Sequence, residues 1–470
     1  MAFDFLRKRV NRSALRSLRQ RGSHVDRFKL TSRRRIRETL LSDEEISNAV
    51  REFAAEHQVS EREVWRKVEQ YIDEIVPFFN ILAYYRFGYF VSRALLHLFY
   101  KVSAEQHGRI GPSFLPKDAV VVYLMNHRSN ADYVLVGYVL TGQVAISYAV
   151  GEWARAFPLE YIFKSFGSYF IRRKFREPLY HKVLERYVQL ITRNGVTQGI
   201  FPEGALTRDG KLHAGKIGLL DYIIGVARDP SFRDRIYLVP VGINYDRVLE
   251  DRSLLRELAV REGQRTTPRS KQMREVASYL WWNAGRLALG RFRRYGRAAV
   301  TIGEPVSLKP WFEAVESAGQ DLFTLPRAER LAEVQTLCDE VMARIGSIIP
   351  VTPVPLACAA IQSLDSDFIS RDALIARMSD MRDVLDELNA RTIRADGPIE
   401  ETFERAWKML SMRKMLVESG EGYAVLPDNR SLISYYANSV AHLLGDFQEG
   451  IRLRDTLPSM RGWKTERPTA

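Results

Sequence analysis

The chain has 470 residues, of which 46% are hydrophobic and 27% charged, so we expect a globular protein with two or three structural units rather than one core. Its only cysteines are Cys338 and Cys358, and no CxxC or histidine-rich cluster occurs, which argues against a disulfide scaffold or a metal site and suits a reducing, intracellular compartment. The net charge of +13 suggests a nucleic-acid partner at first sight, so its distribution decides what it means.

Most of this charge lies in a basic N-terminal arm, residues 1–37. The arm holds 13 Lys or Arg against two Asp and so carries +11 of the total, which leaves the rest of the chain nearly neutral. Such an arm could touch anionic lipid headgroups, hold nucleic acid or direct the chain to an organelle, and a solvated tail is an equally good interpretation. We expect no nucleic-acid partner.

Residues 38–110 read as a helical region with a segment suited to a membrane surface. No apolar run approaches the roughly 20 residues that a membrane span needs. Residues 75–100 are rich in aromatic and aliphatic side chains but are interrupted by basic ones, and residues 279–295 combine tryptophan with arginine. Both segments fit a bilayer surface, although amphipathic helices that pack on a core remain an equal alternative.

The region 111–310 alternates between strand-like and helical patterns, which predicts an α/β domain with a mixed, largely parallel sheet and a site at its strand ends. We expect strands at residues 119–124, 144–150, 168–171, 197–201, 236–243 and 298–302. We expect helices at residues 132–140, 152–165, 178–193, 216–227 and 268–289.

A histidine and an aspartate follow the first of these strands, in the sequence VVYLMNHRSNADYV (121–134). On a continuous helix their five-residue spacing would turn the side chains roughly 140° apart, so they meet only if the polar NHRSN run bends the backbone. His127 and Asp132 would then form a general base and its orienting partner. Alternatively, Ser129 caps the helix, Asp132 favours its positive end, and His127 is an ordinary loop residue.

Two further polar constellations follow strands. In GSYFIRRKF (167–175), Arg172 and Arg173 suit a phosphate dianion, although strand alternation would instead leave one solvated and one ion-paired. In FPEGALTRDGKLHAGK (201–216), a carboxylate and a glycine precede three cations, and a simple polar turn is the alternative. The residues of interest in this second stretch are Glu203, Gly204, Arg208, Lys211 and Lys216.

A proline and a helical C-terminal region complete the pattern. Pro240 interrupts the buried strand in IYLVPVGINYD (236–246), which implies a sheet edge, a bulge or a local constraint at a site. Residues 325–455 are expected to be helical, and prolines 350, 353 and 355 are expected to form a linker. The helices of this region are expected at residues 327–348, 371–389, 399–418 and 431–445.

The motifs NHRSNAD, GSYFIRR, FPEG and LVPVGINYD follow one another in an order that resembles the glycerolipid acyltransferases, whose signature is a histidine, four residues and an aspartate. The length, the FIRR motif and the helical flanks are more similar to the glycerol-3-phosphate and dihydroxyacetone-phosphate acyltransferase branch than to the shorter lysophosphatidate enzymes. LISYYANSVAHLL (432–444) is similar to the C-terminal segment of that branch. The resemblance covers residues 70–447 and is diagnostic in the four motifs.

The resemblance implies that His127 takes the proton from a glycerol hydroxyl as it attacks an acyl thioester, with Asp132 supporting the imidazole. It implies acyl-CoA or acyl carrier protein as co-substrate, with no further cofactor and no metal. It also implies that Glu203 and Gly204 shape the acceptor site and that Pro240 positions a wall near the acyl donor. The cations implied to hold the acceptor phosphate are Arg172, Arg173, Arg208, Lys211 and Lys216.

The acceptor is the open question. After the Glu-Gly pair the branch usually carries a second glycine, an arginine and a serine, whereas this chain has Ala205 and Leu206 before Thr207 and Arg208. FPEG itself is closer to the lysophosphatidate enzymes. We expect transfer to the sn-1 hydroxyl of glycerol-3-phosphate in phospholipid synthesis, with lysophosphatidate or dihydroxyacetone phosphate as alternative acceptors and a non-enzymatic basic binding protein as the alternative class. Because the product partitions into lipid, we expect peripheral or monotopic attachment at the cytoplasmic face of a bacterial inner membrane.

Overall fold

The computed structural model of the chain describes residues 28, 31–79, 89–106, 115–116, 118–140, 144–151, 159–173, 175–261, 295–317, 321–393 and 397–445. Most of the basic arm, nearly all of the second interfacial segment and the helix expected at 268–289 lie outside these described residues. Residues 80–88 of the first interfacial segment do so as well. Within the described part of the chain, no helix is both long and apolar enough to cross a bilayer.

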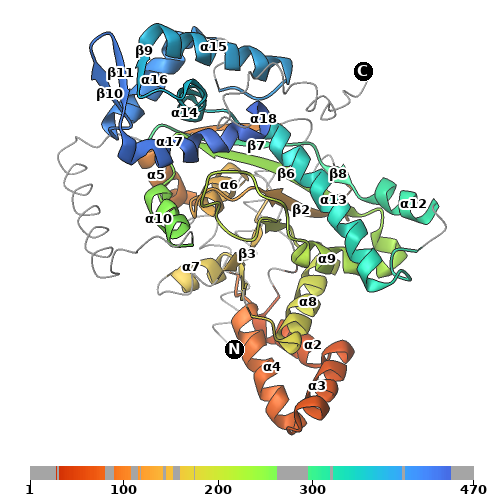
Figure 1. The fold of residues 1–470 in the computed structure, drawn as a ribbon. Coiled ribbons are helices and arrows are strands. Elements are labelled where there is room, and N and C mark those ends of the chain that lie inside the picture. The colour runs from red at the N-terminus through yellow and green to blue at the C-terminus, as the bar shows by residue number, and fades with distance from the viewer. Residues whose placement is uncertain are drawn as a thin grey trace.

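A mixed, parallel-rich sheet forms the centre of the molecule, in the order β1-β7-β6-β2-β5-β3-β4, with the short β8 paired to β6 (Figure 1). Neighbouring strands run parallel except that β7 and β8 run antiparallel to β6. The strands are β1 (Lys101–Gln106), β2 (Val120–Met125), β3 (Ser147–Gly151), β4 (Tyr169–Ile171), β5 (Gln198–Ile200), β6 (Ile236–Tyr245), β7 (Arg297–Ile302) and β8 (Val306–Ser307). The predicted fold class is therefore confirmed.

Alternation along β2 shows how the sheet separates two cores. Val122 and Leu124 pack into one cluster, with the helices α8 (Pro178–Arg193), α9 (Gly218–Ile224) and α13 (Arg327–Ile348). Tyr123 and Met125 point to the other face, where they pack in one cluster with α6 (Asp132–Leu140), α14 (Pro353–Leu364) and α17 (Arg430–Ala437). The remaining helices on the sheet are α5 (Tyr89–Phe99), α7 (Leu159–Ser165), α10 (Asp251–Arg261) and α12 (Lys309–Ser317).

The N-terminal helices α2 (Arg33–Leu41), α3 (Glu44–His57) and α4 (Glu61–Ile75) lie below the sheet in Figure 1. Each begins with a polar side chain that accepts a backbone N–H of the first turn, as capping requires. The capping residues are Ser32, Asp43 and Ser60. Asp43 also pairs bidentately with Arg186 of α8, at 2.8–2.9 Å, which ties these helices to the α/β domain.

Two expectations about secondary structure, one before the α/β domain and one after it, were wrong. Residues 101–106 were expected within a helical region but form the edge strand β1, whose side chains are mostly exposed and so lack an apolar alternation. The proline-rich linker is instead the start of α14, where Thr352 is the N-cap and Pro353 occupies the first turn. Proline suits that turn because its missing N–H would be unpaired there in any case.

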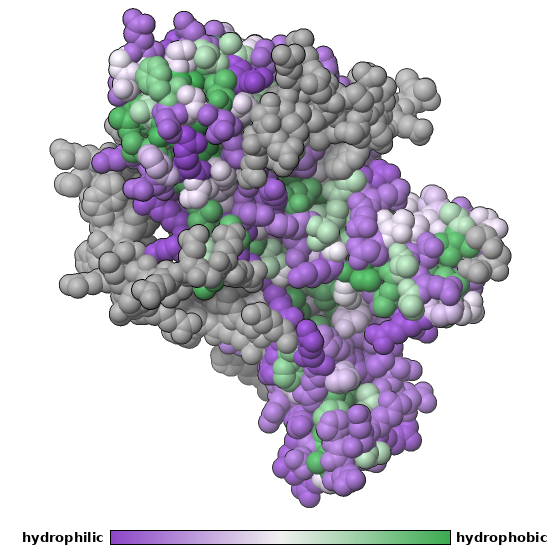
Figure 2. Space-filling view, in the orientation of Figure 1, coloured by the Kyte–Doolittle hydropathy of each residue, from purple (hydrophilic) through white to green (hydrophobic). Residues whose placement is uncertain are grey.

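The C-terminal region adds α15 (Arg371–Glu387), α16 (Ile399–Met412), the short α18 (Ala441–Leu444) and a small sheet. That sheet has the order β10-β11-β9, from β9 (Phe368–Ser370), β10 (Leu416–Ser419) and β11 (Gly422–Val425). The helix expected at 399–418 therefore ends early, and Lys414 takes a positive φ of 56° at the turn into β10. Figure 2 shows apolar surface over this small sheet, where Phe368 is half exposed.

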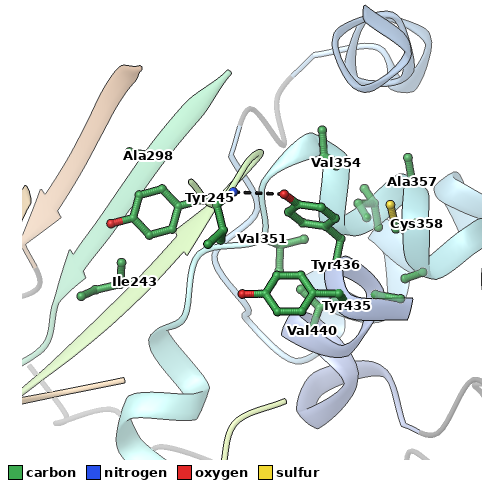
Figure 3. Packing of buried hydrophobic residues seen from close by; sticks show 14 of the residues in the cluster. Ile243, Tyr245, Ala298, Val351, Val354, Ala357, Cys358, Tyr435, Tyr436 and Val440 are labelled. Carbon is green, nitrogen blue, oxygen red and sulfur yellow. Dashed lines mark hydrogen bonds between the residues drawn. The ribbon is translucent and has the colours of Figure 1, made fainter. Parts of the chain in front are cut away.

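The C-terminal helices dock directly on the end of β6 (Figure 3). The Tyr436 hydroxyl accepts a hydrogen bond from the backbone N–H of Val248 at 3.0 Å and donates one to Asp251 at 2.5 Å. Arg413 completes a buried ion pair with Asp251, with Nη2 to Oδ1 at 3.0 Å. Burial opposes ionisation of Asp251, but the Arg413 charge and these hydrogen bonds outweigh it and keep the pKa of that carboxyl below its usual value.

Candidate active site

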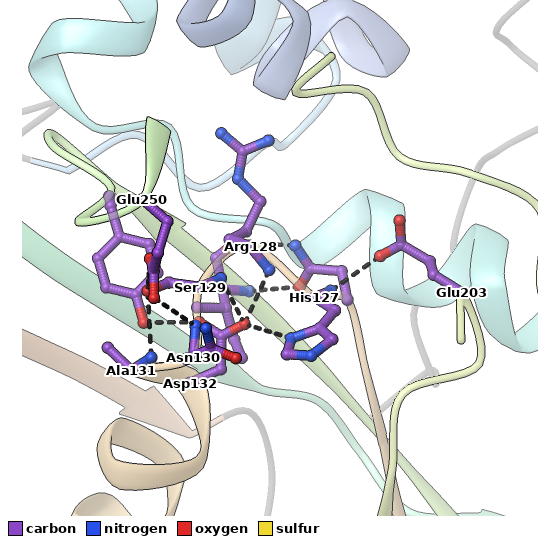
Figure 4. Close-up of polar contacts among 11 residues, drawn as sticks. His127, Arg128, Ser129, Asn130, Ala131, Asp132, Glu203 and Glu250 are labelled. Atoms are coloured by element: carbon purple, nitrogen blue, oxygen red, sulfur yellow. Dashed lines mark hydrogen bonds and ion pairs between the residues drawn. The ribbon is translucent and has the colours of Figure 1, made fainter. Parts of the chain in front are cut away.

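The sharp turn between β2 and α6, residues 126–132, carries the predicted catalytic pair, and we call it the catalytic turn (Figure 4). Asn126 begins the turn, and its side chain both donates to the carbonyl of Ile243 at 2.9 Å and accepts from the Ile243 N–H at 2.8 Å. This amide pair extends the contact between β2 and β6 beyond the last ladder residue, Met125. The turn is therefore fixed at the carboxyl end of the sheet.

The bend expected in the NHRSN run is present, and it brings His127 Nδ1 within 3.0 Å of Asp132 Oδ2. Both side chains are fully buried. The same carboxylate oxygen accepts the backbone N–H groups of Arg128 at 2.7 Å and Ser129 at 3.0 Å. Tyr245 donates its hydroxyl to the other oxygen at 2.6 Å. Asp132 thus organises the turn backbone and the imidazole together.

The surroundings of His127 favour a neutral ring. Burial lowers its pKa, the hydrogen bond and charge of Asp132 oppose this, and the charge of Arg173 adds to it. Because the carboxylate can only accept, the ring proton belongs on Nδ1. Nε2 is then a bare lone pair, and it has no hydrogen-bond partner among the described residues. Phe201 stacks on the ring with centroids 4.0 Å apart and holds its plane.

Glu203 fastens the following loop to the catalytic turn. Its Oε1 accepts the backbone N–H of His127 at 2.8 Å, and its Oε2 accepts that of His213 at 3.3 Å. Burial raises the pKa of Glu203 to about 7, although both backbone hydrogen bonds lower it. Next to it, Gly204 has a φ of +73°, and a Cβ there would lie 3.2 Å from Cδ of Lys216. The glycine thus leaves room for the lysine to lie across it.

The structure separates Arg172 from Arg173. Arg172 forms a bidentate ion pair with Glu74, with Nε to Oε1 at 2.8 Å and Nη2 to Oε2 at 2.5 Å. Its guanidinium also lies 4.8 Å from the centre of the Phe175 ring. Arg173 is exposed and lies against Gly151 at the end of β3. This is the alternative that strand alternation predicted, with one arginine ion-paired and the other exposed. Of the two, Arg173 is the one whose charge acts on His127. A phosphate contact for Arg172 stays a prediction.

The other predicted site residues lie farther apart. Arg208 pairs with Glu257 of α10 at 2.9 Å, and Lys211 is exposed. Pro240 lies in a central strand, where the neighbour of β6 changes from β8 to β7, and its carbonyl accepts the Gly303 N–H at 2.8 Å. The proline nitrogen points to the same side of β6, at the break between β8 and β7. The missing N–H therefore removes no hydrogen bond between strands. Its role beside an acyl donor remains a prediction.

Among the residues that sequence reasoning missed, Tyr245 and Glu250 support the turn. Tyr245 holds Asp132, and Glu250 accepts the Ser129 hydroxyl at 2.7 Å and the Asn130 N–H at 3.2 Å. Tyr245 lies inside the LVPVGINYD motif, so its place at the end of the strand next to β2 was a usable signal. Glu250 lies beyond any motif. No group of three or more His, Cys, Asp or Glu in the described part of the chain is arranged to hold a metal ion.

Two family models match the chain: Acyltransferase over residues 110–244 and Glycerol-3-phosphate acyltransferase C-terminal region over residues 282–446. The resemblance to the glycerolipid acyltransferases is therefore confirmed in these two regions of the chain. The first match covers the catalytic turn, Arg173 and Glu203, and the second covers the helices that dock on β6.

Curated relatives share this assignment. A glycerol-3-phosphate acyltransferase of Aeromonas hydrophila is 26% identical over 422 residues, covering 88% of this chain and 50% of the relative. One of Xylella fastidiosa is 28% identical over 456 residues, covering 93% and 49%. This chain thus spans about half the length of the curated relatives it matches.

A solved structure, the 1-acyl-sn-glycerophosphate (LPA) acyltransferase PlsC from Thermotoga maritima, is 20% identical and covers 56% of this chain and 78% of its own. Its TM-score of 0.30 is too low to support a structural argument.

The neutral ring of His127 predicts a pH profile. Because burial lowers the pKa of this histidine, the acid limb of kcat/KM should lie below the ordinary histidine value of about 6.5, with activity lost only as the pH falls through the lowered pKa. Rates measured from pH 4.5 to 9 check this. Glu203→Gln should leave the limb in place, since the carboxyl is not the base; a limb that disappears in this variant would identify Glu203 as the titrating group instead.

Proposed function

We propose that this chain transfers a fatty acyl group from an acyl thioester to the sn-1 hydroxyl of glycerol-3-phosphate in phospholipid synthesis. The observation that carries the proposal is the buried His127, whose Nδ1 is held by Asp132 while Nε2 lacks a partner within the described chain. The names of the curated relatives support this choice of acceptor.

The reaction follows from that geometry. Nε2 takes the hydroxyl proton as the glycerol oxygen attacks the thioester carbonyl, so the C–O bond forms while Asp132 stabilises the imidazolium. The C–S bond then breaks, and the imidazolium returns its proton to the leaving thiolate. A positioned base of this kind contributes roughly 10² to 10⁴ in rate. The thioester is already activated, so the proposal needs only acyl-CoA or acyl carrier protein as co-substrate and no covalent acyl-enzyme.

Two cations suit the acceptor phosphate. Arg173 follows β4 and Lys216 lies across Gly204, and neither has an ion-pair partner among the described residues. The strand order places β5 next to β2, with β3 and β4 beyond, so these groups approach the turn from the same edge of the sheet. Arg172 and Arg208 are already held by carboxylates and are less suited to this task.

The atypical loop after Glu203 favours a second candidate acceptor. Ala205 and Leu206 stand where the branch usually has glycine and arginine, and FPEG is closer to the lysophosphatidate enzymes. Dihydroxyacetone phosphate remains the third acceptor to compare.

An acceptor panel tests the proposed reaction. With acyl-CoA and acyl carrier protein thioesters in turn, the purified protein should acylate glycerol-3-phosphate with the highest kcat/KM. His127→Ala should reduce turnover by roughly 10² to 10⁴, to near background, because the base is lost. The surface variant His57→Ala, in α3, should keep wild-type turnover. A clear preference for lysophosphatidate would replace the acceptor, and an active, folded His127→Ala would contradict the mechanism.

The two arginines of the FIRR motif should respond differently. Arg173→Ala should raise the KM for glycerol-3-phosphate about 10- to 100-fold, the effect of losing one charge-assisted hydrogen bond, with little change in thermal stability. Arg172→Ala should instead lower the melting temperature, because it removes the ion pair of Arg172 with the mostly buried Glu74 carboxylate. Steady-state kinetics and thermal unfolding of both variants make the comparison. Equal effects on KM would return Arg172 to the phosphate site.

We also propose peripheral attachment to a lipid surface, at the cytoplasmic face of a bacterial inner membrane. Large apolar side chains are exposed in or next to α5, α7 and α10, which lie on one side of the molecule in Figure 1. These side chains are Phe90, Leu95, Tyr161, Leu249 and Val260. Apolar side chains beside a site whose product is a lipid suit an interface with a bilayer.

Liposome flotation tests this attachment. The protein should float with anionic liposomes at low salt, and the double variant Phe90→Ser with Tyr161→Ser should bind at least roughly 10²-fold more weakly, because burying each aromatic ring contributes about 1.5–3 kcal/mol. Phe368→Ser, which removes an exposed aromatic ring from the small sheet, is the control and should float like the wild type. Flotation that is unaffected by the double variant would place the contact elsewhere.

A further inference from the structure

The loop that carries Glu203 is held between the catalytic turn and a C-terminal helix. On one side, the backbone N–H of Thr207 donates to the carbonyl of His127 at 3.1 Å. On the other, the side chain of Asn438, just beyond α17, donates to the carbonyl of Asp209 at 2.8 Å. Segments that are 229 residues apart in sequence thus meet through one loop.

Gly210 shows how closely the loop and α17 approach each other. Its φ is +87°, and a Cβ built there would lie 1.9 Å from the carbonyl oxygen of Tyr435. Because that atom belongs to the helix backbone, it cannot move aside as a flexible side chain would. The loop therefore packs against α17 in one tightly defined position.

Arg128, the neighbour of the catalytic histidine, contacts all three parts. Its backbone N–H donates to Asp132 at 2.7 Å, its Nη1 donates to the carbonyl of Gly210, and its guanidinium carbon lies 5.1 Å from the centre of the Tyr435 ring. Arg128 as a whole is only 3% exposed. One buried guanidinium thus links the turn, the loop and α17.

The energetics argue against a purely stabilising role for this arginine. Within the described residues Arg128 forms no ion pair, and its Nε and Nη2 make no hydrogen bond. A buried charge without a carboxylate costs stability, in contrast to Arg413, whose partner Asp251 is buried with it. The planar guanidinium does offer what a lysine cannot, a directed hydrogen bond combined with stacking on an aromatic ring.

We propose that Arg128 is a positioning residue that seats the loop on both the catalytic turn and α17, so that the C-terminal helices become a working part of the active site. The inference rests on the proposed acyl transfer by His127. Its consequence follows from Glu203, whose carboxylate holds the His127 backbone: a loop that shifts moves the base. Displacing a catalytic group by about 1 Å can cost on the order of 10² in rate.

Kinetics of Arg128→Lys and Asn438→Ala test the link. Each should lower kcat about 10- to 100-fold while the KM for the acyl thioester changes little, because the chemical step and not donor binding depends on the loop. Arg430→Ala is the matched control: Arg430 also lies on α17, but it faces solvent and pairs with Asp365 and Asp367. This variant should keep the wild-type kcat.

The double variant decides whether the two residues act through the same loop. If they do, Arg128→Lys with Asn438→Ala should lose little more than the worse single variant, whereas independent roles would multiply the losses. Multiplied losses, or wild-type kcat in both folded single variants, would overturn the proposal. If Arg128→Lys fails to fold, Asn438→Ala and Gly210→Ala, compared with Arg430→Ala, carry the test.

Hydrogen exchange provides a readout that needs no activity. The amides of Thr207 and Gly210 should exchange faster in Asn438→Ala than in the wild type or Arg430→Ala, because the loop has lost the hydrogen bond of Asn438 to the Asp209 carbonyl. Unchanged protection would overturn the positioning role. A wild-type protein that acylates none of the acceptors would instead overturn the proposed function, so the two failures are distinguishable.

Discussion

The buried carboxylate of Asp132 is the constraint on which the active site depends. A carboxylate with no solvent contact is tolerated only if hydrogen bonds surround it, and here two backbone amides, an imidazole and a tyrosine hydroxyl do so. The amides can reach it only if the backbone turns sharply after His127. The same hydrogen bonds that make burial of the charge possible therefore also bend the turn and fix the ring. Catalytic geometry and local folding are one requirement in this motif.

The segment that ends β6 extends that requirement to the rest of the molecule. Tyr245 reaches Asp132, Glu250 reaches Ser129, and Asp251 reaches Arg413 in the C-terminal region. One short segment, residues 245–251, thus contacts both the catalytic turn and the C-terminal helices, which lie far away in the sequence. This arrangement explains why the acyltransferase domain and the C-terminal helices share one hydrophobic cluster rather than meeting at a polar surface.

Local patterns predicted much of this structure, and long-range partners could not be predicted. The boundaries of α8 and α13 follow from helical patterning and flanking turn residues, and those of α6 from a continuous apolar run. The pairing of His127 with Asp132 follows from a short polar run between a strand and a helix. The partner of Arg172 could not be foreseen, because Glu74 lies 98 residues away and no pattern links the two. The prolines around the start of α14 were misread because proline suits both a linker and the first turn of a helix. Glu250 escaped notice for a related reason, since its role exists only once β6 lies beside β2.

The close approach of Gly210 to Tyr435 has a consequence for the order in which the protein becomes active. The strands of the sheet and the residues of the catalytic turn all precede α17 in the chain, so during synthesis the α/β core can begin to assemble before that helix has left the ribosome. The loop after Glu203, however, has its final surface only once α17 has docked, a contact between segments more than 200 residues apart that is among the slowest kinds to form. The final arrangement of the site therefore forms late, and a nascent chain that stops short of α17 has His127 in place without the helix that supports the loop after Glu203.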